Sequence, residues 1–226
     1  AVSKPEVIMK KGEKGEKLEP FEELIISVPE GYAGAVISKL NIRKGIMTEM
    51  ISENGYSKIN YILPTRGLLG YRTEFINDTR GEGTMVRSFK CFDRYKGEIP
   101  GRTNGVAIAQ EPGIATSYAL FNIQERATLF IEPGTKVYEG MIIGVTARAE
   151  DMVVNPSKAK KSTNMRASGS DDALKLSPAK KMTLEEALEF IENDELVEIV
   201  PDDIRLRKKY LKELERRRKG NVAKNR

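Results

Sequence analysis

Histidine is absent from the 226-residue sequence, and cysteine occurs once, at Cys91. The absence of histidine excludes Ser-His-Asp and Cys-His catalysis and every histidine-ligated metal site. A single cysteine cannot form an internal disulfide, which favours a reducing cytosol. The sequence also lacks a G-x-x-x-x-G-K-[ST] motif and so carries no P-loop for a nucleoside triphosphate. We therefore expect no catalytic residue, no metal site and no cofactor in this chain.

Long apolar runs are also missing. No segment approaches the roughly 20 apolar residues of a membrane span, and the first residues lack the apolar stretch of a secretory signal. Hydrophobic residues make up 39% and charged residues 31%, a composition typical of a globular protein with a charged surface. We expect a cytoplasmic monomer of two domains that makes no contact with a membrane.

Positive charge gathers at the end of the chain. Residues 204–226 carry eleven Lys and Arg against Glu213 and Glu215, a net charge of +9 within an overall charge of +5. A basic end on a mildly acidic body favours a polyanionic partner. A solvated and frayed terminal helix is the alternative interpretation.

The first half of the sequence has the pattern of a ferredoxin-like split β-α-β fold. Alternating apolar residues and the hairpin signal Asn54-Gly55 predict strands over 21–28, 46–52, 56–63 and 84–92. Apolar residues at helical spacing predict a first helix over 33–40. A second helix is expected to open at Pro64-Thr65, with Thr65 as N-cap and a buried side made of Leu68, Leu69, Phe75 and Ile76. This topology hosts many functions and indicates none by itself.

The stretch RGLLGYR, residues 66–72, resembles the G-x-x-G loop with which KH domains clamp an RNA backbone. KH domains place that loop between two helices, whereas here it follows a strand directly. Close packing of helix on sheet is therefore the preferred role of Gly67 and Gly70. Arg66 and Arg72 remain candidates for a phosphate near the helix N-terminus.

The second half is expected to be a small β-rich domain. Gly, Pro and charged residues at 95–105 mark the boundary, and short apolar runs predict strands over 106–110, 114–121, 127–131, 136–138 and 141–147. A capping box, Thr183 with Glu186, opens a helix, and strands follow over 195–201 and 204–211 before a helical basic tail. The fold class is thus α+β, with a ferredoxin-like domain over 19–95 and a barrel-like β-rich domain with one or two helices over 96–226.

Residues 155–173 form a basic loop with almost nothing that packs into a core. Its cations are Lys158, Lys160, Lys161 and Arg166, and its short polar side chains include Ser162, Thr163, Asn164 and Ser168. From composition alone, a surface loop without a partner is the simpler interpretation. Neighbouring acids such as Asp171-Asp172, Glu185-Glu186 and Asp202-Asp203 point in different directions on a strand or helix, which argues against catalysis by such pairs.

Several strings resemble known families. LPTRGLLGYRTEFINDTRGEGTM (63–85) resembles domain V of translational GTPases of the elongation factor G type. NGVAIA (104–109), ALFNIQERATLFI (119–131), TNMRASGSDDA (163–173) and MTLEEALEFIENDELVE (182–198) resemble the TypA/BipA family of ribosome-associated GTPases. The resemblance implies that this chain is the C-terminal part of a larger protein, in which a G domain outside this sequence holds GTP and magnesium. It also implies that residues 1–18 are the end of a preceding domain and a linker.

The resemblance also implies a partner, the ribosome, through large-subunit rRNA and the acceptor end of the A-site tRNA. The implied role is large-subunit assembly and translation under stress or at low temperature. The loop 155–173 would then contact RNA through the eight polar and charged residues named above, Lys158 to Ser168. Secondary RNA-contact candidates are Arg66, Arg72, Arg205, Arg207, Lys208, Lys209, Arg216, Arg217 and Arg218. The alternatives are a ferredoxin-like regulatory module that senses a small ligand and contacts only proteins, and an enzyme in its own right.

Overall fold

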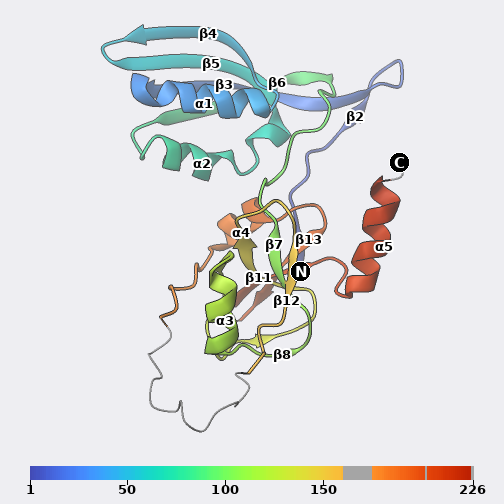
Figure 1. The fold of residues 1–226 in the computed structure, drawn as a ribbon. Helices are drawn as coiled ribbons and strands as arrows, with labels where there is room; N and C mark the ends of the chain where they lie inside the picture. The colour runs from blue at the N-terminus through green and yellow to red at the C-terminus, as the bar shows by residue number, and fades with distance from the viewer. Residues whose placement is uncertain (160–174, 202, 225–226) are drawn as a thin grey trace. The chain divides into compact units, whose positions relative to one another are not determined.

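The computed structural model describes residues 1–159, 175–201 and 203–224, and the chain divides into two compact units. The N-terminal unit comprises Pro5–Gly101, and the C-terminal unit comprises Ala1–Lys4 with Arg102–Arg226 (Figure 1). No helix within the described ranges is long and apolar enough to cross a membrane.

The N-terminal unit is an antiparallel sheet with its helices on one face (Figure 1). The strand order is β4-β5-β3-β6, with the short β2 beside the start of β3. The predicted ferredoxin-like split β-α-β fold is therefore confirmed. The elements are β2 (Lys10–Lys11), β3 (Lys17–Pro29), α1 (Glu30–Ile42), β4 (Ile46–Glu53), β5 (Tyr56–Pro64), the 3₁₀ turn η1 (Thr65–Leu68), α2 (Tyr71–Asp78) and β6 (Thr84–Arg94).

Alternation along the second half of β3 shows which face of this sheet the helices cover. Leu24, Ile26 and Val28 are fully buried against the helices, whereas Ile25 lies exposed on the opposite face. Helix α1 contributes Ala33, Val36 and Leu40 to the same core. Because side chains of a strand point alternately to its two faces, one apolar set per strand suffices to seat both helices.

The second helix begins later than the sequence predicts. Thr65 opens a 3₁₀ turn instead of capping a helix, and Gly70, at φ +73°, separates that turn from α2, which starts at Tyr71. The positive φ favours glycine and interrupts the helical pattern. The interruption also changes which side chains are buried: Tyr71 and Phe75 lie in the core, and Ile76 is exposed.

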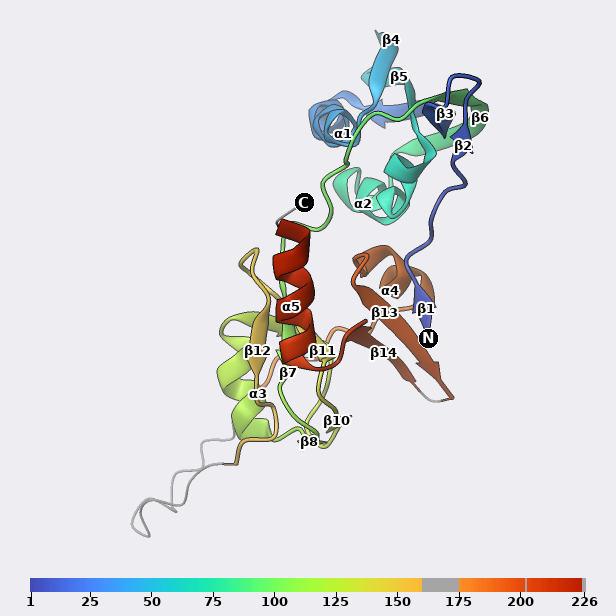
Figure 2. The same cartoon turned by 90° about the vertical axis from the view of Figure 1, so that its right-hand side faces the viewer.

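The C-terminal unit is built on a mixed sheet in the order β1-β13-β14-β11-β7-β12, with β9 also paired to β11 and a separate β8–β10 ribbon (Figure 2). Only the pairing of β12 with β7 is parallel among the ladders that the structure describes. The elements are β1 (Val2–Ser3), β7 (Val106–Ala109), β8 (Gly113–Ile114), α3 (Ser117–Gln124), β9 (Ala127–Leu129), β10 (Lys136–Val137), β11 (Met141–Thr146), β12 (Met152–Val154), α4 (Leu184–Phe190), β13 (Glu195–Val200), β14 (Asp203–Lys208) and α5 (Glu213–Lys224).

Two cores lie on the two faces of this sheet. Ala107 and Ala109 of β7 pack into a cluster with Leu120 and Ile123 of α3. Val106 and Ile108, which point the other way, pack into a second cluster with Ala187 of α4. The predicted β-rich domain is confirmed, and its central strand is buried on both sides because a helix covers each face.

The predicted strand over 114–121 is wrong. The strand here comprises only Gly113 and Ile114, and Ser117–Gln124 forms α3 with Thr116 as its N-cap. The buried residues Ala119, Leu120 and Ile123 have helical spacing, and packing on the sheet outweighs the β-propensity of the segment. The capping box at Thr183 and Glu186 is present as predicted, with bonds of 2.9 and 3.2 Å.

The ends of the two units differ from the boundaries expected at residues 18 and 95. Val2 and Ser3 pair with β13 inside the C-terminal unit, so the first residues are part of its sheet. Beyond β6, the amide of Tyr95 donates to Lys17 O (3.0 Å) and that of Lys96 to Glu19 Oε1 (2.8 Å). These bonds extend the N-terminal unit to Gly101.

Two glycines of the N-terminal unit should respond in opposite ways to alanine. A Cβ at Gly67 would lie 2.8 Å from the carbonyl oxygen of Arg43, so Gly67→Ala should lower the free energy of unfolding by about 1–3 kcal/mol. A Cβ at Gly34, inside α1, meets nothing within 4 Å, so Gly34→Ala should raise it by about 0.5–1 kcal/mol. Urea unfolding of both variants measures the two changes, and equal shifts of one sign would contradict the packing described for Gly67.

Candidate nucleic-acid interface

The basic loop starts from a well-ordered turn at the end of β12. Asn155 Oδ1 accepts from the amide of Ser157 at 2.9 Å, and Asn155 Nδ2 donates to the Glu111 carboxylate. Pro156 is buried, and the Ser157 hydroxyl occupies the space in which a Cβ on Gly113 would lie. The first stem of the loop, residues 155–159, is thus fixed to the β7–β8 connection.

Thr116 fastens this first stem to the start of α3. Its amide donates to Pro156 O at 2.9 Å, and its hydroxyl donates to Lys158 O at 2.8 Å. The same hydroxyl oxygen accepts from the Ala119 amide at 3.2 Å as the helix N-cap. One side chain therefore caps the helix and orients the backbone on which Lys158 stands.

Gln124, the last residue of α3, fastens the second stem. Its Nε2 donates to Lys175 O and its Oε1 accepts from the Ser177 amide, both at 3.0 Å. Leu176 packs against the core beneath α3, and the Lys180 amide donates to Leu129 O at 2.8 Å. Thr116 and Gln124 lie about 12 Å apart by helical rise, so α3 sets the separation of the two stems.

Exposed lysines stand on both stems: Lys158 on the first, and Lys175, Lys180 and Lys181 on the second. Helix α3 carries no charged residue between its ends. The only ion pair that these lysines form within the described ranges joins Lys181 to Glu132 at 3.5 Å, and both side chains are largely exposed. The stems thus present positive charge on a polar surface, which suits an anionic partner.

The structure places only part of the predicted RNA-binding set. Lys158 is exposed, with its backbone held by Thr116. The other seven residues lie outside the described residues: Lys160, Lys161, Ser162, Thr163, Asn164, Arg166 and Ser168. Sequence reasoning missed Thr116 and Gln124, because it took 114–121 for a strand. The N-cap signal at Thr116, followed by apolar residues at helical spacing, could have revealed them.

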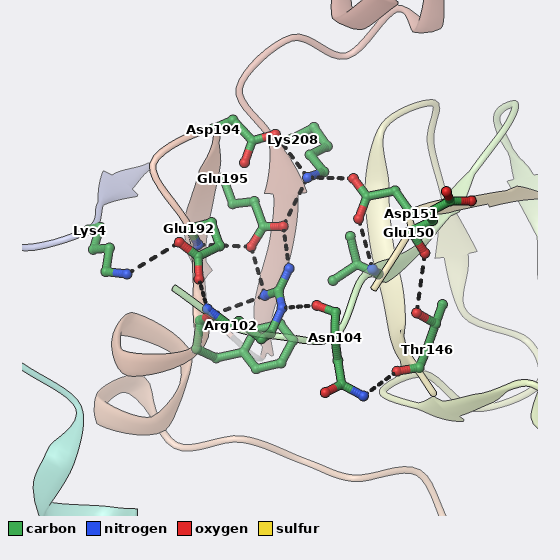
Figure 3. A network of polar contacts seen from close by, with 12 residues as sticks. Lys4, Arg102, Asn104, Thr146, Glu150, Asp151, Glu192, Asp194, Glu195 and Lys208 are labelled. Atoms are coloured by element: carbon green, nitrogen blue, oxygen red, sulfur yellow. Dashed lines mark hydrogen bonds and ion pairs between the residues drawn. The ribbon is translucent and has the colours of Figure 1, made fainter. Parts of the chain in front are cut away.

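Lys208 is not available to RNA and is corrected to a structural residue (Figure 3). It is 3% exposed, and its Nζ contacts Asp151 (2.8 Å), Asp194 (2.9 Å) and Glu195 (3.0 Å). Burial alone would lower the pKa of Lys208, but the three carboxylates outweigh burial and raise it above its ordinary value. A cation neutralised in this way contributes nothing to the surface potential.

Glu195 lies at the centre of the same cluster and is 0% exposed. Arg102 Nη2 and Lys208 Nζ contact its Oε1 at 2.9 and 3.0 Å, and Arg102 Nη1 donates to its Oε2 at 3.0 Å (Figure 3). Burial would raise the pKa of Glu195, but the hydrogen bond from Arg102 and the charge of Lys208 lower it below 4.5. No group of three or more His, Cys, Asp or Glu in the described ranges is arranged to hold a metal.

Arg66 is also corrected. Its guanidinium donates twice to the buried Glu19 carboxylate and once to Gly97 O, and it lies 4.5 Å over the Tyr95 ring. It therefore holds the segment after β6 and is not free to meet a phosphate. A buried carboxylate requires such a partner.

The remaining secondary candidates fall into two groups. Arg207 donates to Glu198 at 2.6 Å, Arg205 donates to Asp203 at 3.2 Å, and Arg216 donates to the carbonyl oxygens of Tyr210 and Leu211, so these three are engaged within the unit. The exposed group consists of Arg72, Lys209, Arg217 and Arg218. Within it, Arg217 pairs with Glu213 one helical turn away at 2.6 Å, an exposed contact of low energy.

Comparison with known sequences identifies both units. The family described as elongation factor G C-terminus matches residues 16–103, and the family described as TypA/BipA C-terminal domain matches residues 104–213. The two matches define a class of proteins in which a domain like the C-terminus of elongation factor G is followed by a second domain specific to the TypA/BipA family.

Curated relatives carry the same two domains in longer chains. The chain is 47% identical over 225 residues to the large ribosomal subunit assembly factor BipA of Haemophilus influenzae, covering 99% of this chain and 36% of that relative. It is 44% identical over 227 residues to the factor of the same name from Escherichia coli K12, covering 100% of this chain and 37% of that relative. A crystal structure of a Thermus thermophilus protein aligns with 36% of this chain and 12% of its own, at 26% identity and a TM-score of 0.35. The chain belongs to the TypA/BipA family and corresponds to the C-terminal domains of its members.

The buried ion cluster predicts a specific dependence of stability on pH. Glu195→Gln should lower the free energy of unfolding by about 3–5 kcal/mol near neutral pH, because it leaves Arg102 and Lys208 without their buried counter-charge. The pKa of Glu195 is lowered on folding, so its contribution is present above the unfolded value of 4.5 and is lost as the pH falls through the folded value.

The difference between wild type and Glu195→Gln should therefore shrink in acid. Denaturant unfolding between neutral and acidic pH measures it. Glu185→Gln, an exposed carboxylate in the first turn of α4, serves as the control and should change stability by less than about 1 kcal/mol. A variant Glu195→Gln as stable as wild type at neutral pH would contradict the role of the cluster.

Proposed function

We propose that this chain is the ribosome-contacting part of a translational GTPase that acts in assembly of the large ribosomal subunit. The observation that carries the proposal is the anchored basic loop: both of its stems are fastened to α3, and exposed lysines stand on both. The name of the matched relatives, large ribosomal subunit assembly factor, supports the same partner. GTP and magnesium are assigned to a G domain of the longer relatives, since this sequence has no P-loop.

In finer terms, we assign the loop 155–173 to large-subunit rRNA and to the acceptor end of the A-site tRNA, in the cytoplasm and in translation under stress or at low temperature. Folded RNA presents phosphates and 2′-hydroxyls, which Lys, Arg and short polar side chains recognise. The anchors at Thr116 and Gln124 restrict where the loop begins and ends. Fixing the two stems before binding reduces the entropy that the stems lose on meeting a partner.

Charge removal in the loop should weaken binding to large ribosomal subunits. A variant with Lys158, Lys160, Lys161 and Arg166 all changed to Ser should keep its fold, because surface substitutions usually change stability by less than about 0.5 kcal/mol each. Each lost phosphate contact also removes counterion release, so the log–log salt slope should flatten by about 3. Co-sedimentation with large subunits over a range of salt concentrations measures both effects.

The matched control removes four exposed cations outside the loop: Lys209, Arg217, Arg218 and Lys219. It should leave the salt slope closer to wild type than the loop variant does. If only the control loses affinity, the tail is the RNA anchor and the proposed role of the loop is wrong. A wild-type chain that stays in the supernatant at low salt would favour the ligand-sensing alternative.

We expect Gln124 to affect ribosome affinity without contacting RNA itself. Gln124→Ala removes both bonds to the second stem, and we expect ribosome affinity to fall by about threefold to tenfold, since the second stem then loses more entropy on binding. Asn122→Ala is the control, because its side chain donates within α3, to Tyr118 O, and affinity should not change. Circular dichroism and the same sedimentation assay test the pair, and equal affinities of both variants would argue against anchoring.

A further inference from the structure

A row of aromatic and basic side chains continues along one face of β6 beyond the core of the N-terminal unit. Residues paired across a ladder share a face, and Met85, Arg87 and Phe89 pair with Ile26, Leu24 and Glu22. After a bulge, Phe92 and Arg94 pair with Pro20 and Leu18. Because Leu24 and Ile26 lie on the helix-bearing face, the whole row Met85, Arg87, Phe89, Phe92 and Arg94 lies on that face.

The helices cover only the first member of this row. Met85 packs against the core of α1 and α2, whereas Phe89 is 62% exposed. The Phe89 and Phe92 rings pair at 5.7 Å between centroids and 58° between planes. Among the described elements, β6 pairs with β3 alone, so its other edge is unpaired. The largely exposed Phe89 and the neighbouring ring of Phe92 therefore leave an aromatic surface open to a partner.

Cations surround the two rings. Lys10 lies on β2 and pairs with Leu18 of β3, and its Nζ lies 3.9 Å from the centroid of the Phe92 ring. Arg87 forms a long ion pair with Glu22, with 3.8 Å between Nε and Oε2, and its side chain remains largely exposed. Among the described residues, neither Lys10 nor Arg94 has an ion pair with a carboxylate. The rings are therefore flanked by positive charge that the fold itself leaves largely unpaired.

This combination suits RNA better than a protein surface. Protein interfaces are depleted of lysine at their buried centre, where Lys10 would lose water without gaining a counter-charge. An unpaired nucleotide offers a base that stacks on an aromatic ring and a phosphate that meets Lys or Arg. The opposite face of the same sheet exposes Ile25, Val86 and Tyr56. Its ring–cation pair, Lys96 over Phe21 at 5.9 Å, offers no open ring, because Phe21 is buried.

We propose that Phe89 and Phe92 form a stacking platform for an unpaired base of RNA, and that Lys10, Arg87 and Arg94 contact its phosphates. Phe89 presents the open ring, while Lys10 lies over Phe92. The platform belongs to the N-terminal unit and is separate in sequence from the basic loop. It rests on the proposed function in one respect, the choice of RNA as the partner.

Binding of a short fluorescein-labelled single-stranded RNA of mixed sequence, followed by anisotropy with the full chain, tests the platform. Phe89→Ala should weaken binding about tenfold, because stacking of one base on an aromatic side chain accounts for a change of that order. Phe89→Tyr keeps an aromatic ring and should restore most of the affinity. Val86→Ala is the matched control: Val86 is 64% exposed on the same strand, pairs with Ile25 on the opposite face, and should bind as wild type does.

A second arm separates charge from stacking. Changing Lys10 and Arg94 to Ser should flatten the salt slope by about 1.4, at about 0.7 per phosphate of a single strand. The loop variant described above should bind this RNA as wild type does, even where it fails to bind large subunits. If the loop variant sediments normally, the proposed function of the loop fails while the platform stands.

Three results would overturn the platform. They are no anisotropy change with wild-type protein, equal affinity of Phe89→Ala and wild type, and an equal loss in Val86→Ala. A fourth is a Phe89→Ala chain that binds this RNA normally but loses binding to intact large subunits. That result would assign the patch to a ribosomal protein and not to a base.

Discussion

One buried carboxylate, Glu195, holds together segments from the whole length of the C-terminal unit. Its two cations are Arg102, where the unit resumes after the N-terminal unit, and Lys208, at the end of β14. Lys208 in turn contacts Asp151 just before β12. A buried charge is destabilising unless an opposite charge lies beside it. Displacement of one of the three segments would therefore destabilise the positions of the other two. The cluster thus ties the segment before β7, the start of β12 and the β13–β14 pair to one another across the sheet.

The loop stems depend on that sheet. Helix α3 packs on one face of β7 and β11 through Leu120 and Ile123, and the ends of the helix hold the stems through Thr116 and Gln124. A rigid helix on a buried sheet thus positions both stems of the basic loop. Such division of labour is common, because a segment that recognises an external partner gains little from packing inside its own domain.

The N-terminal unit separates core and surface by another means. A single face of its sheet carries the helices, and the row on β6 passes from core to surface without a change of face: Met85 is covered, and Phe89 is not. The length of the helices relative to the strands decides where cover ends. The strand β6 is eleven residues long and α2 eight, and a strand rises more than twice as far per residue as a helix. The strand β6 therefore extends beyond the end of helix α2.

Much of this architecture could be predicted from local patterns. Alternation in β3, the Asn54-Gly55 turn and the capping box at Thr183 are local signals, and the structure has the predicted element at each. The same holds for the exposed position of Lys158 on a segment that is poor in apolar residues. These features depend on neighbours in sequence, for which propensity and periodicity are adequate guides.

Other features depended on partners distant in the chain, and only the tertiary structure decided them. The segment 114–121 has strand-like composition, yet the sheet surface it covers makes it a helix from Ser117 onward. Lys208 and Arg66 looked like free cations, and their carboxylate partners, Glu195 and Glu19, lie 13 and 47 residues away. The sequence by itself thus determined that this chain is basic, that it has no histidine chemistry and that it is built as two α+β units. Which of its cations face a partner was decided by burial, because only the folded chain brings distant carboxylates to some of them and leaves the others in water.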